Sequence, residues 1–220
     1  MDETQNGKKM LRLAVEVTLC LLIAVILVGL IQQFFLAPVA VVGESMMPTI
    51  NESGDKVYVQ KKFYNISRGD VVVFYRPNNK DVTSKNPSNS ISVADFFNSL
   101  PFVNKIPKVS EDAASDYTCV IKRVIGVEGD HIEIRYVSAS SAQLLRNGSI
   151  IKDFPMYPTI YVASGGVKEG SWTVGKGELF VLGDNRNNSF DSEDYGPIQA
   201  SWLMGKVVLA KIDGKYKRKL

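Results

Sequence analysis

The chain has 220 residues, 45% of them hydrophobic, 22% charged and 10% aromatic, and its formal net charge is +3. This length suits one domain of ordinary size, and so small a basic excess argues against a nucleic-acid partner. The single histidine, His131, and the two cysteines, Cys20 and Cys119, are too few for a zinc site built from His and Cys. We expect neither a metal nor any other cofactor.

The N-terminal region carries one long apolar segment. Residues 17–31 contain nothing more polar than Thr18 and Cys20. With its flanks the segment reaches ~20 residues, and at ~1.5 Å per residue this covers the ~30 Å hydrocarbon layer of a bilayer. We therefore predict a cytoplasmic tail, a transmembrane anchor and an outer domain, over residues 1–12, 13–36 and 37–220.

A cleaved secretory signal is the alternative to a retained anchor. Its apolar core is usually shorter and ends near small residues. A cut after Ala37 would leave the bulky Phe35 at the third position back, and a cut after Ala40 would leave Pro38 there. Both fit poorly, so we favour the anchor.

The basic residues predict the orientation of the anchor. Lys8, Lys9 and Arg12 precede the apolar segment, and no Lys or Arg follows it until Lys56. The N-terminus should therefore be cytoplasmic and the outer domain extracytoplasmic. Cys20 then lies in lipid, so we expect no disulfide with the cysteine of the outer domain.

Past the anchor, short runs rich in Val, Ile and Tyr alternate with Gly, Asn, Asp and Pro, which is typical of strands and turns. Asn147-Gly148 predicts a tight hairpin, because both residues accept positive φ. We expect a mainly β domain built as a folded sheet or barrel. The predicted strands are residues 39–42, 56–61, 70–75, 118–127, 131–136, 143–146, 159–162, 178–182 and 203–211.

A polar stretch interrupts this pattern, and we interpret residues 77–116 as an insertion. Ser92 fits the N-cap of a short helix within it. The apolar residues that follow either pack on the domain core or dip into the bilayer, where Lys105 and Lys108 would meet anionic headgroups. These apolar residues are Phe96, Phe97, Leu100, Phe102, Val103 and Ile106.

Three segments contain candidate catalytic residues. Ser45 lies where the first predicted strand ends, between Gly43 and Pro48, and by itself it reads as a turn residue. Lys122 lies in a strand that is apolar on both sides, and burial would lower its pKa from ~10.4 to about 7 or 8, which makes its amine a usable base for a serine hydroxyl. The alternative is that Lys122 and its neighbour Arg123 both reach solvent from a sheet edge.

The third segment, residues 183–192, follows an apolar strand and is dense in short hydrogen-bonding side chains. Such a loop can position a lysine amine with a hydroxyl and anchor an arginine with carboxylates. Because neighbouring strand residues point to opposite faces, we expect Arg123 to form an ion pair on the face away from Lys122, with Asp191 or Asp184.

These residues resemble the type I signal peptidases, which are membrane-anchored serine proteases with a Ser/Lys dyad. The single-anchor form is similar to Gram-positive members. Four segments occur in the family's order behind one N-terminal span. They are Ser45-Met46-Met47-Pro48-Thr49, residues 68–74, Lys122–Gly126 with Gly129-Asp130, and residues 183–189 with Asp191-Ser192.

The resemblance implies roles for individual residues. Ser45 attacks the peptide carbonyl, Lys122 is the general base, and Ser189 hydrogen-bonds the lysine amine. The Ser45 backbone N–H contributes to an oxyanion hole, and Gly43 stands where some members have a serine. Asp184, Arg186 and Asp191 are structural neighbours. Glu193 replaces an arginine that is common in relatives, which would leave Arg123 as the main partner of Asp191.

The expected substrates are secretory preproteins at the membrane surface. From Phe35 to Ser45 there are ten residues, which extend to at most ~35 Å, so the nucleophile stays near the lipid. A precursor could add an extended strand beside residues 39–43. Family resemblance implies small side chains at the first and third positions before the cut.

Three other readings remain open at this stage. Ser53-Gly54-Asp55-Lys56 matches a Ser-x-x-Lys motif, but that motif requires a helix. His131 is the only possible histidine base for a Ser-His-Asp triad. A membrane-tethered β domain that only binds partners is the third. A buried Lys122 within hydrogen-bond reach of Ser45 would favour the protease.

Overall fold

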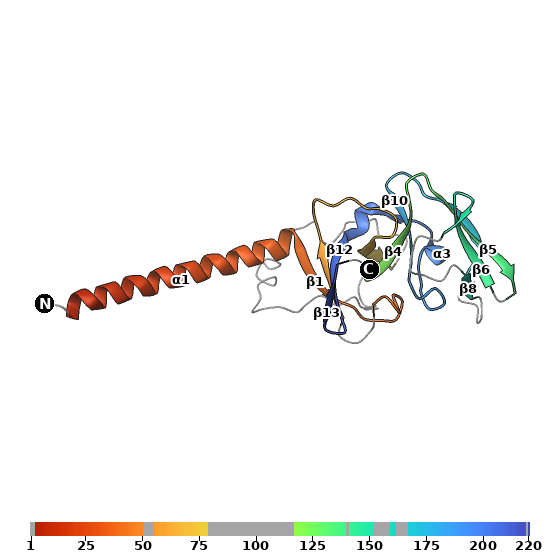
Figure 1. Cartoon of the computed structure of the whole chain (residues 1–220). Coiled ribbons are helices and arrows are strands. Elements are labelled where there is room, and N and C mark those ends of the chain that lie inside the picture. Colours follow the sequence, from red (N-terminus) through yellow and green to blue (C-terminus); the bar gives the residue numbers. More distant parts are fainter. Residues whose placement is uncertain are drawn as a thin grey trace. The chain divides into compact units, whose positions relative to one another are not determined.

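The computed structural model describes residues 3–50, 55–78, 117–139, 141–151, 159–161, 167–218 and 220 (Figure 1). It divides into two units, which we describe separately. The first contains helix α1 (Glu3–Phe34), and the second contains a β domain. The predicted insertion and its apolar cluster fall almost entirely within residues 79–116, outside the described residues.

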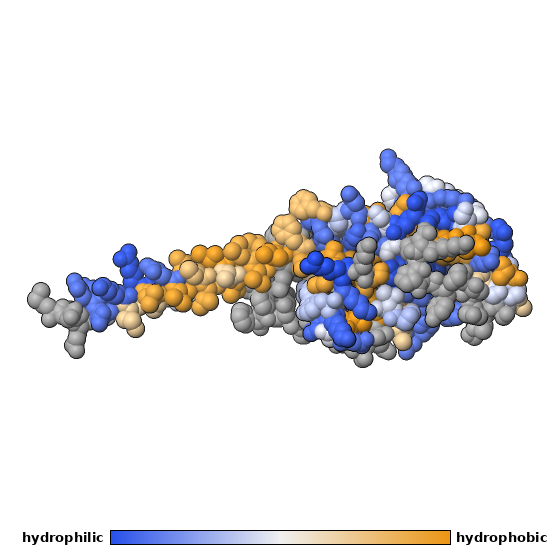
Figure 2. Space-filling model, in the orientation of Figure 1, coloured by the Kyte–Doolittle hydropathy of each residue, from blue (hydrophilic) through white to orange (hydrophobic). Residues whose placement is uncertain are grey.

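Helix α1 is long and apolar enough to cross a membrane over Gln5–Ile31. Its apolar side chains form an orange band in Figure 2. Near the start of the band Arg12 Nε lies 3.6 Å from Glu16 Oε1, one helical turn away, with both side chains exposed. Thr18 donates its hydroxyl to the Ala14 carbonyl at 2.8 Å, so its polar atom is satisfied within the helix. The apolar N-terminal helix predicted from the sequence is therefore present.

The larger sheet of the β domain has eight strands among the described residues. Seven of them follow the order β1-β2-β12-β3-β4-β10-β11, and β13 pairs with β12. The pairs β2–β12, β12–β3, β3–β4, β4–β10, β10–β11 and β12–β13 are all antiparallel. Their bounds are β1 (Leu36–Ala40), β2 (Lys56–Gln60), β3 (Val71–Pro77), β4 (Tyr117–Val127), β10 (Glu178–Leu182), β11 (Ile198–Gln199), β12 (Leu203–Ile212) and β13 (Lys215–Lys217).

A second, five-stranded sheet follows the order β7-β6-β5-β9, and β8 pairs with β6. Asn147 and Gly148, both with positive φ, form the turn of the β6–β7 hairpin, as predicted. A short helix, α3 (Ser192–Tyr195), and a 3₁₀ turn at Ala200–Trp202 complete the described elements. The strands are β5 (His131–Ser138), β6 (Ser141–Arg146), β7 (Ser149–Ile150), β8 (Thr159–Tyr161) and β9 (Gly170–Thr173).

Alternation along β3 builds apolar layers on both faces of the larger sheet. Val71 and Val73 belong to one buried cluster, and Val72 and Phe74 belong to another. Because both faces are covered, the strand reads as a continuous apolar run rather than an alternating one. A third cluster lies under the second sheet and combines residues of β4, β5, β6 and β10.

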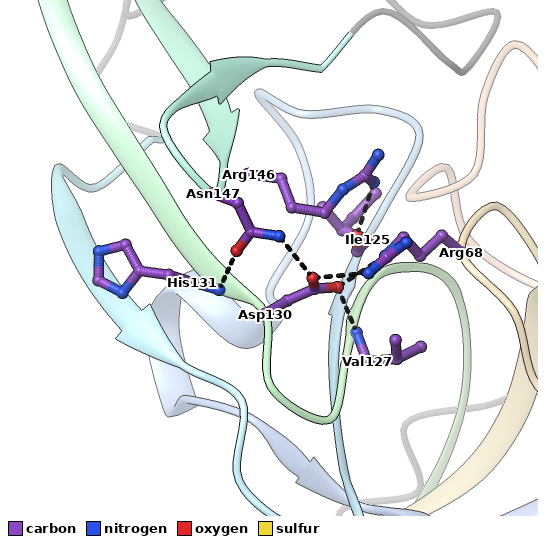
Figure 3. A network of polar contacts seen from close by, with 7 residues as sticks. All are labelled: Arg68, Ile125, Val127, Asp130, His131, Arg146 and Asn147. Atoms are coloured by element: carbon purple, nitrogen blue, oxygen red, sulfur yellow. Dashed lines mark hydrogen bonds and ion pairs between the residues drawn. The ribbon is translucent and has the colours of Figure 1, made fainter.

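Asp130 is the centre of a polar network at the turn between β4 and β5 (Figure 3). Arg68 donates to both of its carboxylate oxygens, at 2.7 and 2.8 Å. The Val127 amide and the Asn147 side chain donate at 3.0 and 2.9 Å. The network thus ties the loop before β3 to the turn of the β6–β7 hairpin.

The prediction of a mainly β domain behind an apolar helix is confirmed, and each of the nine predicted strands overlaps an observed one, the first by only two residues. The short strands β9, β11 and β13 were not predicted, and β7 was expected only as the second arm of the Asn147-Gly148 hairpin. Near the C-terminus, an Asp213-Gly214 turn with positive φ at both residues folds β13 back onto β12, and all three β13 residues are exposed.

Candidate active site

One cavity of about 590 Å³ brings the three candidate segments together. It lies within the β domain and includes Gly43, Ser45, Lys122 and Ser189, which come from parts of the chain far apart in sequence. Its described lining residues are Val42, Gly43, Glu44, Ser45, Cys119, Val120, Ile121, Lys122, Asn187, Asn188, Ser189, Phe190 and Asp194.

The Ser45 segment forms a compact turn after β1. Gly43 has φ +93°, a conformation that a residue with a side chain rarely adopts. The Ile50 amide donates to the Met46 carbonyl at 3.0 Å, and both of these side chains are fully buried. The buried methionine and isoleucine anchor the turn in the core, while Ser45 stays half-buried at the cavity.

Two asparagines connect this turn to the loop after β10. The Asn185 amide donates to the Ser45 carbonyl at 2.9 Å, and its side chain donates to the Glu44 carbonyl at 3.2 Å. Asn188 Nδ2 donates to the Glu44 carboxylate at 3.1 Å. Neither asparagine was predicted from the sequence to be a site residue. The density of Asn in this loop was the only signal, because their partners lie about 140 residues away.

Lys122 lies in the middle of β4, opposite Val72 of β3. Only 3% of its surface is exposed, and it lines the cavity. Burial of an amine disfavours its charged form, which suits a base. The alternative that Lys122 and Arg123 both reach solvent is therefore wrong, since the exposed fractions of these residues are 3% and 1%.

Arg123 forms its ion pair with Asp184. Its Nε and Nη2 donate to the two carboxylate oxygens at 2.9 and 2.6 Å, and both side chains are almost fully buried. Nη1 donates to the carbonyls of Gly69 and Leu220 at 2.7 and 3.0 Å. The prediction of Asp184 is confirmed, whereas the expectation that Asp191 is the main partner is wrong.

Asp191 instead organises the backbone around α3. Its Oδ2 accepts the Gly183 amide at 2.8 Å, and its Oδ1 accepts the Glu193 amide, which caps the helix. The Asp194 carboxylate accepts the Asp191 amide at 3.1 Å, completing a capping box. Burial raises the pKa of Asp191. Because its oxygens face backbone amides, this carboxylate does not need the arginine.

Ser189 packs closely against Gly183 at the end of β10. A Cβ atom on Gly183 would overlap the Ser189 hydroxyl and would lie only 2.5 Å from the Ser45 carbonyl oxygen. Only glycine therefore lets the segments that carry Ser45 and Ser189 approach each other here.

Charged groups gather beside α3. Burial lowers the pKa of Arg186, although the charges of Asp191, Asp184 and Glu193 oppose this effect. Burial, followed by the charges of Asp191 and Asp194, raises the pKa of Glu193 to about 8. Glu193 therefore carries a proton at neutral pH for much of the time.

Three carboxylates of this region, from Asp191, Glu193 and Asp194, have oxygen atoms within 4.8 Å of one another, close enough to hold a metal ion. Lys168 Nζ already lies 2.6 Å from Asp194 Oδ1, and Asp191 accepts backbone amides. Two of these carboxylates are therefore already engaged, Asp194 by Lys168 and by the Asp191 amide, and Asp191 by the backbone amides of the helix cap.

The other candidate bases lie elsewhere. His131 begins β5 on the second sheet, where its ring nitrogens lie 3.3 Å from the Thr173 hydroxyl and 3.1 Å from the Ser171 hydroxyl. It is exposed, and it is not among the described residues that line the cavity. Ser53 falls outside the described residues, and Lys56 begins strand β2 rather than lying in a helix.

The fold and the cavity, which a serine and a buried lysine both line, define a candidate serine hydrolase. Residues 14–211 match the family model described as signal peptidase, peptidase S26. Since this match spans most of the chain, the chain belongs to the S26 signal peptidase family, and the resemblance predicted from the sequence is confirmed.

The chain is similar to several known proteins. Signal peptidase I of Mycobacterium tuberculosis (strain ATCC 25618 / H37Rv) is 31% identical over 216 residues, which cover 91% of this chain and 70% of the relative. Signal peptidase I of Bacillus caldolyticus is 29% identical over 201 residues, 84% of each chain. A crystal structure of a signal peptidase I from Enterococcus faecalis V583 has a TM-score of 0.37 and 19% identity, and the match covers 66% of this chain and 98% of that chain.

Proposed function

We propose that this chain is a membrane-anchored serine endopeptidase that removes N-terminal signal peptides from secretory preproteins and cuts after small residues. The observation that carries the proposal is the cavity that Ser45 and the buried Lys122 both line. The names of its relatives, signal peptidase I, support the same substrate class.

In the proposed mechanism the neutral Lys122 amine accepts the Ser45 hydroxyl proton as the serine oxygen attacks the scissile carbonyl. The Ser45 backbone N–H stabilises the oxyanion that forms. When the intermediate collapses, the C–N bond breaks and the lysine ammonium protonates the leaving amine. Water then attacks the acyl-enzyme, with Lys122 again as base, and releases the signal peptide.

Ser189 and Gly43, which both line the cavity, support this chemistry. The Ser189 hydroxyl positions the lysine amine, and its buried place against Gly183 restricts its movement. Gly43, with φ +93°, provides the backbone conformation of the turn that carries Ser45. Arg123 and Asp184 hold β4 to the loop after β10, and Asp191 fixes that loop through the Gly183 amide. Arg186 adds positive charge beside these carboxylates.

The proposed location is the cell membrane, with α1 as a single-pass anchor, the N-terminus cytoplasmic and the β domain outside. The length and composition of α1 support a span, and the three basic residues before it support the orientation. Membrane lipid and membrane-held precursors are then the natural partners. Protease added to sealed cells should digest the β domain if this orientation is right.

The test of the proposed function is a cleavage assay with the full chain in detergent micelles and a secretory precursor. Wild type should release a product whose new N-terminus follows a small residue. Ser45→Ala and Lys122→Ala should abolish this release, while the control His131→Ala should retain it. Cleavage that survives Ser45→Ala would overturn the proposal, and loss of activity in a folded His131→Ala would favour the histidine triad. If wild type binds the precursor without cutting it, the chain is a binding module.

A further inference from the structure

Phe190 is an exposed aromatic residue in the wall of the catalytic cavity. It follows Ser189 directly, lines the same cavity, and 53% of its surface is exposed. The Arg76 guanidinium carbon lies 4.7 Å from the centre of its ring. The Tyr195 ring meets it edge-on, with ring centres 5.4 Å apart.

These contacts hold the Phe190 ring in one orientation. Arg76 also lies 5.3 Å from the centre of the Tyr195 ring, so one cation contacts both aromatic rings. The backbone after Phe190 is fixed as well, because Asp191 caps α3 and accepts the Gly183 amide. A ring that is held on two sides and still half exposed offers a preformed apolar surface to a ligand.

The chemistry of the proposed reaction indicates which part of the substrate meets this surface. The lysine that takes the serine proton must later reach the leaving nitrogen, so the residues after the cut begin on the Lys122 and Ser189 side of the cavity. An extended chain advances ~3.3–3.6 Å per residue, so the first two residues after the cut cover ~7 Å. Phe190 follows Ser189 directly and lines the same cavity.

We infer that Phe190 is a specificity-determining residue that selects an apolar side chain at one of the first two positions after the scissile bond. This inference rests on the proposed function. It means that the mature part of the precursor contributes to recognition, in addition to the small residues before the cut. Arg76 is the positioning residue that keeps the ring facing the substrate.

The experiment uses the full chain in detergent micelles and matched precursor peptides that differ only by Leu or Ala at the first or second residue after the cut. Wild type should prefer Leu at one of these positions by about fivefold in kcat/KM, the gain expected for partial burial of an apolar side chain. Phe190→Ala should bring this ratio close to one, and Phe190→Leu should keep most of it. Arg76→Gln should lower the ratio part of the way.

Phe63→Ala is the matched control. Phe63 is 87% exposed, lies between β2 and β3, and is not among the described residues lining the cavity. Its replacement should leave the Leu/Ala ratio unchanged. An unchanged ratio in Phe190→Ala at both positions would overturn the inference, as would an equal loss on all peptides together with a lower melting temperature.

A binding series separates this inference from the proposed function. Peptide affinities are measured in a Ser45→Ala background with and without Phe190→Ala. The Leu peptide should bind about fivefold tighter than the Ala peptide only when Phe190 is present. Cleavage that persists in Ser45→Ala would overturn the proposed function alone, because the binding ratio still decides the role of Phe190.

Discussion

The Arg123 guanidinium and the Asp184 carboxylate form a two-bond ion pair, with donor–acceptor distances of 2.9 and 2.6 Å, that joins β4 to the loop after β10. The exposed fractions of the two side chains are 1% and 0%. Lys122 precedes the arginine, and Gly183 precedes the aspartate. The pair therefore fixes the distance between the strand of the proposed base and the loop that carries Ser189.

Arg123→Ala should destabilise the protein by about 3 to 5 kcal/mol, because it leaves a buried carboxylate without its partner. The melting temperature and the activity should fall together. The control is Arg135→Ala, which removes a half-exposed arginine paired with Glu133 and should cost about 1 kcal/mol or less. Normal thermal stability of the Arg123 variant without activity would instead indicate direct contact with substrate.

Lys122→Arg should be nearly inactive even though it keeps a long basic side chain. An arginine guanidinium keeps its proton at any pH at which the protein is folded and active, so it cannot accept the Ser45 proton. In wild type, kcat/KM should rise with pH as the lysine amine becomes neutral. A cleavage rate for the arginine variant comparable to wild type would rule out lysine as the base.

Gly183→Ala should reduce activity by at least about tenfold. If the displaced side chains raise the activation free energy by ~1.4 kcal/mol, that is enough for such a loss. The added Cβ would overlap the Ser189 hydroxyl and would also crowd the Ser45 carbonyl oxygen. Gly175→Ala is the control, because the three atoms nearest to an added Cβ there belong to the flexible side chain of Glu178. Equal activity of the two variants at equal melting temperature would show that the contact with Ser189 does not matter.

Glu193→Gln should stabilise the protein at pH 8 to 9 and change little near pH 4.5. The folded pKa of Glu193 is about 8 against an ordinary 4.5, because burial and then the charges of Asp191 and Asp194 oppose ionisation. Between these values the folded state holds the proton more tightly, so the stability of wild type falls as pH rises. The expected gain is about 1 to 3 kcal/mol in urea unfolding. A constant difference between the two proteins at all pH values would contradict this assignment.

The free energy of unfolding of Asp130→Asn should fall less than that of wild type as the pH is lowered from 4 to 2. Burial alone raises the pKa of Asp130, but the hydrogen bonds from Arg68, Val127 and Asn147 outweigh it and lower the pKa from 3.8 to about 2. Its contribution is therefore present above pH 4 and is lost as pH falls to 2. Since Arg68 is half exposed, we expect about 1 to 2 kcal/mol. Acid titrations of folding that coincide for the two proteins would argue against the network.

The sequence alone predicted the elements whose signals are local. The apolar helix, the nine main strands and the Asn147-Gly148 turn depend on periodicity and turn chemistry, which act over a few neighbouring residues. The strand β9 was missed because Gly170-Ser171-Trp172-Thr173 is too short and polar to stand out, and its Trp172 is stabilised by Phe180 of β10, with ring centres 5.1 Å apart. A contact of that kind leaves no local pattern.

The candidate catalytic residues were also predicted from the sequence. Lys122 lies in a strand that is apolar on both sides, and Ser45 begins the first of four segments that occur in a recognisable family order. Only the tertiary structure decided which charges pair. Asp184 and Asp191 lie in one loop and look equally suited to Arg123, but Asp191 accepts the Gly183 amide and caps α3, which leaves Asp184 for the arginine. Partner choice between similar carboxylates depends on burial and on competing backbone amides, and these exist only once the sheets have packed.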